Sequence, residues 1–168
     1  MEEIIGPLGF TDMDPEGLLI EGYDQPGTMV AIYNYPYYVN HITRLGYEKD
    51  NDWVEFKIYV PEEIPVKHKR ISDIVQAKYK LKVLKYNSIK KIVKDYGRKI
   101  FELINQAYAD LYGYSALSEK QIDYYVKMYV PMVRLENVSL IVNDKEELVG
   151  VGIAIPSMTK ALQKATGK

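Results

Sequence analysis

The sequence predicts an α/β protein in which a mixed sheet is flanked by helices. Segments with a period of two, such as DWVEFKIYV at 52–60, alternate along the chain with segments of helical spacing, such as 88–112. The 168 residues, 47% hydrophobic and 27% charged, have the composition of about one globular domain. Because the chain has no cysteine, disulfide scaffolds, thiol nucleophiles and cysteine zinc sites are excluded.

The first 66 residues contain two predicted strands, 2–5 and 52–60, joined by a long loop and two short helices. The loop covers residues 11–27, where glycine and proline recur. Pro36 separates the helices because the residue before a proline disfavours helix, and Gly46 is placed to end the second one. The two predicted helical pieces are TMVAIY at 28–33 and YVNHITRLGY at 38–47.

PEEIPVKHKR at 61–70 is rich in proline and charge, so it is the predicted joint between two parts of the chain, 1–66 and 67–168. The second part has helical spacing from Ile71 to Tyr79, and then alternates strands with helices. Its predicted elements are a strand at 81–86, helices at 88–112 and 118–130, a hairpin at 137–155 and a basic helical tail at 157–168. One compact domain is the alternative, in which all the strands share one sheet.

Charge is divided unevenly along the chain. Residues 1–66 hold 3 basic and 13 acidic side chains, a net of −10, whereas residues 67–99 hold 12 and 2, a net of +10. Two such segments are expected to face each other or solvent. Nucleic acid on the basic segment is the alternative, since Tyr79, Tyr86 and Tyr96 lie among the lysines. Solvated helix faces produce the same pattern, so we expect no nucleic-acid partner.

The stretch GFTDMDPEG, residues 9–17, resembles the start of a calcium loop, with acids at alternate positions followed by Gly17. A twelve-residue loop that begins at Asp12 needs a glutamate at its last position, which is Tyr23. We therefore expect no metal site here, and we expect an acidic loop that caps its own amides. The two histidines, His41 and His68, lie in no catalytic motif.

Two stretches resemble the GNAT N-acyltransferase superfamily. YVNHITRLGYEKDNDWVEFKI is similar to the late helix and strand of that fold, with Arg44 to Tyr47 at the helix end. KVLKYNSIKKIVKDYGRKIFELINQAYADLYGYSALSEKQIDYY, followed by VSLIVNDKEELVGVGIAIP, resembles its opening: a strand, two helices and a hairpin with the pattern D-x-x-x-L-V-G. The chain is thus similar to the middle of larger bacterial proteins that carry two GNAT-like modules in tandem.

The resemblance implies a partial or permuted GNAT-like fold and acyl transfer from acetyl-CoA or another acyl-CoA to a small-molecule amine acceptor. The family binds the coenzyme pyrophosphate through R/Q-x-x-G-x-G/A, which this sequence lacks, so we expect the chain to be inactive alone. Ile42 stands where the family often has a tyrosine general acid, and Tyr37 and Tyr38 do not inherit that role. No catalytic or coenzyme-binding residue is therefore assigned.

The resemblance also implies which residues border the acceptor groove, because the family lines it from the first two helices and the region after the fifth strand. Asp12 and Asp14 become candidate contacts for an amine or cationic group, and the loop from Thr11 to Gln25 lies beside them. The alternative is that the tyrosines are residues at the edge of the core. The candidate tyrosines are Tyr33, Tyr35, Tyr108, Tyr112 and Tyr114.

The expected partners follow from the fold and the charge. Exposed strand edges would be covered by a second copy in a homodimer or swapped dimer. MEEIIGPLGF has acids where a signal peptide needs bases, and no apolar run is long enough to span a bilayer, so a cytoplasmic protein without membrane contact is expected. The alternative to an acyltransferase relative is a non-catalytic binding or assembly module, which the charge division and the missing pyrophosphate motif favour.

Overall fold

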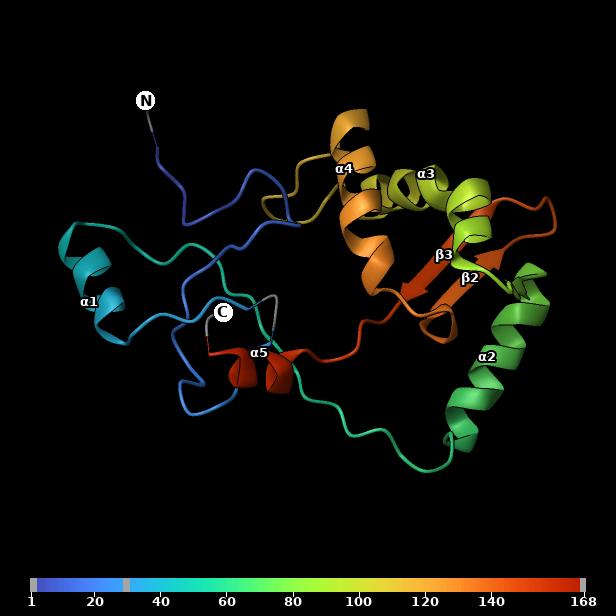
Figure 1. The fold of residues 1–168 in the computed structure, drawn as a ribbon, viewed down its shortest axis with the longest axis horizontal. Coiled ribbons are helices and arrows are strands. Elements are labelled where there is room, and N and C mark those ends of the chain that lie inside the picture. Colours follow the sequence, from blue (N-terminus) through green and yellow to red (C-terminus); the bar gives the residue numbers. More distant parts are fainter. Residues whose placement is uncertain (1–2, 29–30, 167–168) are drawn as a thin grey trace. The chain divides into compact units, whose positions relative to one another are not determined.

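The structure of the protein, a computed structural model, describes residues 3–28 and 31–166 (Figure 1). The chain divides into two compact units, Met1–Lys57 with Pro156–Lys168, and Ile58–Ile155. The division into 1–66 and 67–168 concerns the ancestry of the two halves and stays a prediction. The structure is a mixed α/β protein, which confirms that part of the predicted fold class.

In the first unit, the regular elements of the described residues are two short helices. Helix α1 (Tyr37–Arg44) begins directly after Pro36. Gly46, with a φ of +89°, follows the end of α1, as predicted from the glycine at that position. Helix α5 (Thr159–Ala165) is connected to the loop region by a 3.1 Å hydrogen bond from the hydroxyl of Thr159 to the carbonyl of Gly27. The rest of the described unit is loop.

The second unit contains a three-stranded sheet in the order β1-β2-β3, formed by β1 (Lys82–Leu84), β2 (Val138–Val142) and β3 (Leu148–Ile153). Both strand pairs are antiparallel, with Leu84 opposite Leu140 and Leu140 opposite Val151. The predicted strand at 81–86 and the predicted hairpin at 137–155 are therefore confirmed. The prediction of a mixed sheet is wrong for the described residues, because no parallel pair is present among them.

Two helices connect β1 to β2 (Figure 1). Helix α3 (Ile89–Ala107) packs on the sheet through Ile92 and Ile100, which form the core together with Leu140. Helix α4 (Glu119–Tyr129) begins with a capping box, in which Oε1 of Gln121 accepts hydrogen bonds from the amide and the hydroxyl of Ser118. Two short 3-10 helices, Val130–Met132 and Leu135–Asn137, lead into β2.

Strand β3 contains two glycines, Gly150 and Gly152. A Cβ on Gly150 would lie 3.3 Å from the Cβ of Ile141, which is tighter than most side-chain contacts. A Cβ on Gly152 would lie 3.9 Å from the Cβ of Ser139, which is an ordinary contact. The close approach is therefore found at Gly150 and not at Gly152.

Helix α2 (Val66–Tyr79) begins inside the predicted joint, with Pro65 immediately before it. Proline fixes φ and has no amide hydrogen, so it is well suited to the start of a helix. None of the residues of α2 is buried. Lys80 ends the helix with a left-handed φ of 51°. The helix is thus a solvated element at the start of the second unit.

Several predicted elements, most of them in the first half of the chain, differ from the structure. Residues 52–60 form no strand, nor do residues 3–5, while residue 2 lies outside the described residues. A strand is stable only with a neighbour that accepts its backbone hydrogen bonds, and the alternating pattern does not supply one. Residues 28 and 31–33 form no helix, and 29–30 lie outside the described residues. The helix predicted at 88–112 ends at Ala107.

None of the helices in the described ranges has both the length and the apolar character needed to cross a membrane.

Candidate functional site

The acidic loop of the first unit is held together by Asp14. Its Oδ2 accepts hydrogen bonds from the amides of Phe10 and Thr11 at 3.0 and 3.1 Å, and its own amide donates to the carbonyl of Thr11 at 2.9 Å. Thr11 is buried, with 4% of its surface exposed. A 2.9 Å bond from the amide of Gly17 to the carbonyl of Pro7 closes the loop. The loop therefore caps its own amides, as the sequence indicated.

The neighbouring carboxylates lie close enough to influence one another. Burial raises the pKa of Asp12, although a backbone hydrogen bond partly opposes this. The pKa of Glu16 is raised by burial first and then by the negative charges of Asp12 and Asp14. Repulsion from neighbouring acids therefore acts on Glu16, whose charged form the loop disfavours. Within the described residues, no three acids or histidines are placed to hold a metal ion.

A row of tyrosine rings lies elsewhere in the first unit. Tyr33 contacts Tyr23 and Tyr35 edge-on, with ring centres 6.4 and 6.3 Å apart. Tyr35 stacks on Tyr37 at 5.8 Å, and Tyr37 stacks on Tyr38 at 4.8 Å. The pKa of Tyr37 is raised, chiefly by a hydrogen bond with Tyr38. The structure therefore brings Tyr33 and Tyr35, which the resemblance singled out, into one aromatic row.

Asn34 positions this row. Its Oδ1 accepts from the amide of Leu19 at 2.7 Å, and its Nδ2 donates to the carbonyls of Leu19 and Tyr35 at 3.2 Å each. The hydroxyl of Tyr23 donates to the same carbonyl of Leu19 at 2.5 Å. The loop around Leu19 is thereby bound to the segment that carries Tyr33 and Tyr35. The sequence gave no indication of this contact, because it joins residues 15 positions apart.

In the second unit, Asn105 organises the connection from α3 to α4. Its Oδ1 accepts from the hydroxyl of Tyr114 at 2.6 Å and from the amide of Leu117 at 2.8 Å, and its Nδ2 donates to the carbonyl of Leu117 at 3.1 Å. Tyr114 and Tyr108 meet edge-on at 5.8 Å, and Tyr112 is partly exposed. The three predicted tyrosines of this unit therefore lie on one connection. Asn105, which was not predicted from the sequence, holds this connection in place.

The seven predicted site residues thus form two groups, one in each unit. Asp12, Asp14, Tyr33 and Tyr35 belong to the first unit, and the other three belong to the second.

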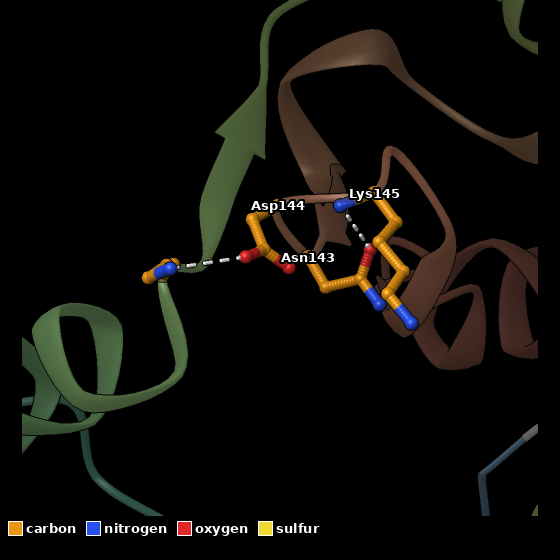
Figure 2. A network of polar contacts seen from close by, with 4 residues as sticks. Asn143, Asp144 and Lys145 are labelled. Atoms are coloured by element: carbon orange, nitrogen blue, oxygen red, sulfur yellow. Dashed lines mark hydrogen bonds and ion pairs between the residues drawn. The ribbon is translucent and has the colours of Figure 1, made fainter.

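The motif D-x-x-x-L-V-G covers the β2–β3 turn and the start of β3 (Figure 2). Oδ1 of Asn143 accepts hydrogen bonds from the amides of Lys145 and Glu147 at 3.0 Å each. Asp144 forms an exposed ion pair with Lys80, 3.3 Å from Nζ to Oδ2, which connects the end of α2 to the turn. Asn143, immediately before the motif, therefore shapes the turn, and Asp144 of the motif connects the turn to the residue that ends α2.

The tyrosines of the basic segment are engaged by their own neighbours. Tyr86 and Tyr96 meet edge-on at 6.1 Å and pack against the core, and burial is the main reason that the pKa of Tyr86 is raised. Lys91 lies 5.8 Å from the ring centre of Tyr86, and Lys99 lies 5.3 Å from that of Tyr96. Two of the three rings are thus partly buried at the edge of the core.

Comparisons of the chain with protein-family models, with curated proteins and with solved structures gave no match.

Proposed function

We propose that the chain is an acyltransferase-related domain of GNAT type, whose ancestral role is acyl transfer from acyl-CoA to an amine acceptor. The observation that carries the proposal is the topology of the second unit. Strand β1 is followed by helices α3 and α4 and then by the hairpin β2–β3, in an antiparallel sheet of order β1-β2-β3. This is the strand, two helices and hairpin that the resemblance implies for the opening half of the fold.

The chemistry of such a transfer sets what the acceptor side must do. The amine nitrogen attacks the thioester carbonyl, the carbon–sulfur bond breaks, and the thiol of coenzyme A leaves while the amine gives up a proton. An acceptor groove must therefore orient an amine and exclude competing water. The α3–α4 connection offers aromatic walls, Tyr108 and Tyr114, in a geometry that Asn105 fixes.

The acyl-CoA side is not supplied by the same residues. The 168 residues contain no R/Q-x-x-G-x-G/A motif, so we propose that this chain alone does not transfer acyl groups. In a complete site, an amine would reach the α3–α4 connection, and the coenzyme would be held by a segment that carries that motif.

The test is a nuclear magnetic resonance titration of the isotope-labelled chain with primary amines, namely spermidine and a set of amino-acid amides. We expect saturable shifts of the amides of residues 108–117 with at least one of these amines. Tyr108→Ala should weaken that binding, whereas Tyr79→Ala, which removes an exposed ring from α2, should not. If no amine shifts residues 108–117, the acceptor assignment is refuted.

A calorimetric titration with acetyl-CoA tests the other half of the proposal. We expect flat heats, because the pyrophosphate motif is missing. Saturable micromolar binding would contradict the statement that the chain lacks the coenzyme side, and it would point to a different mode of binding.

A further inference from the structure

Residues 52–60 lie where the chain passes from the first unit to the second, and they place large apolar side chains in solvent. Val54, Phe56, Ile58 and Val60 have 72%, 77%, 81% and 89% of their surface exposed. These four residues alternate with Trp53, Glu55, Lys57 and Tyr59, so in an extended chain they share one face. An apolar strand face of this kind indicates a surface that another polypeptide covers.

The sequence of the segment is complementary to itself when two copies run antiparallel about Phe56. In that register Phe56 lies opposite Phe56, and Val54 lies opposite Ile58, so one face is apolar throughout its centre. On the other face, Glu55 of each copy lies opposite Lys57 of the other. The register therefore makes two charge pairs of opposite sign, related by the two-fold axis.

The same face also pairs aromatic side chains. Trp53 of each copy lies opposite Tyr59 of the other. One such aromatic pair therefore flanks the two charge pairs on each side. Cross-strand aromatic pairs and opposite-charge pairs are the contacts that stabilise antiparallel strands.

Other registers lose this complementarity. A shift of the centre to residue 55 places Glu55 opposite itself, and a shift to residue 57 places Lys57 opposite itself. Parallel pairing in register places Glu55 beside Glu55 and Lys57 beside Lys57, so like charges meet. Registers in which the centre falls between two residues put the apolar face of one strand beside the charged face of the other. Charge complementarity thus selects the arrangement about Phe56.

We infer that residues 52–60 form an antiparallel β-ribbon with the same residues of a second copy of this chain, centred on Phe56. A second copy would then cover the apolar face that residues 52–60 present when extended. The inference rests on this segment and is independent of the acyl-transfer proposal.

The first test is a charge exchange, measured by sedimentation of the full chain over a range of concentrations. The wild type should dimerise, and Glu55→Lys and Lys57→Glu alone should each weaken the dimer about tenfold or more, because both symmetric pairs become repulsive. The double variant, with both changes in one chain, should dimerise about as well as the wild type. Glu102→Lys, on the exposed surface of α3, is the control with the same change of charge.

Mixing the two single variants sharpens this test. In a mixed dimer both charge pairs are again of opposite sign, so an equimolar mixture should associate more tightly than either variant alone. Lys57→Glu leaves the 3.4 Å bond from the hydroxyl of Thr28 to Glu55 in place, so it separates the interface from that contact. Circular dichroism of each variant checks that the fold is retained.

Cross-linking tests the register directly, because the chain has no cysteine of its own. Phe56→Cys places two thiols opposite each other, at the 4.4–6.8 Å Cα separation that disulfides need, so mild oxidation should give a covalent dimer. Val60→Cys is the control on the same face, since its thiols would lie roughly 27 Å apart in the ribbon. A monomer at all concentrations, a dimer that responds equally to Glu102→Lys, or equal cross-linking at both positions would overturn the inference.

Discussion

Replacing Asn105 by alanine should destabilise the second unit by about 2–4 kcal/mol, because three hydrogen bonds of one side chain are lost together. The amide and carbonyl of Leu117, whose residue is only 6% exposed, would both lose the partner that the side chain supplies. Leaving a buried polar group without a partner costs about 1–3 kcal/mol. The gain in helix propensity from alanine at this position, of a few tenths of a kcal/mol, opposes this only slightly.

The assay is urea unfolding followed by circular dichroism, with amide hydrogen exchange at Leu117 as the local measurement. The neighbouring change Gln106→Ala is the control, because Gln106 is exposed on the same helix turn. Tyr114→Phe removes one of the three bonds and should cost about 0.5–1.5 kcal/mol. If Asn105→Ala is no more destabilising than Gln106→Ala and the exchange of the Leu117 amide is unchanged, the proposed organisation of the connection is refuted.

Three further changes test the loops. Gly9→Ala should displace the acidic loop and speed amide exchange at its capped residues, because its Cβ would lie 2.2 Å from that of Asp14; Gly27→Ala, with no atom nearby, should not. Glu16→Gln should stabilise the first unit at neutral pH, because the charged form of Glu16 is disfavoured in the folded state. The pKa of Glu16 is higher in the folded state, so the stability that its protonation contributes is present below the unfolded-state pKa and is lost as pH rises through the folded-state pKa. The advantage of the variant should therefore disappear in acid, and unfolding measured across that pH window tests this. Asn143→Ala should cost about 1–2 kcal/mol in thermal unfolding, because two turn amides lose their acceptor, and an unchanged midpoint would contradict this.

The elements predicted correctly are those whose partners are close in sequence or whose ends carry clear signals. The hairpin has both of its strands within residues 137–155, so alternation and a turn sufficed to predict it. Helix α4 begins directly after Ser118, the first residue of the predicted helix at 118–130, and Gly46, predicted to end the earlier helix, lies two residues after the end of α1. In these cases the local chemistry determines the structure.

The elements predicted wrongly depend on what lies beside them. Residues 52–60 have the period of a strand, but periodicity describes only which side chains share a face and does not provide a hydrogen-bonded neighbour. The contacts of Asn34 and Asn105 join residues 15 and 12 positions apart, so no local pattern indicates them.

The geometry also distinguishes among the predicted site residues by what their polar atoms already do. Oδ2 of Asp14 accepts from two loop amides, and the hydroxyl of Tyr114 donates to Asn105, so these residues position the loops that carry them. In contrast, the carboxylate of Asp12 has its pKa raised by burial, and Tyr33 and Tyr35 have 57% and 61% of their surface exposed. Burial also raises the pKa of Glu16, and the charges of Asp12 and Asp14 raise it further, so repulsion between the acids acts on Glu16. The acidic loop therefore combines a capping carboxylate, Asp14, which gives it shape, with two carboxylates, Asp12 and Glu16, whose charged forms the loop disfavours.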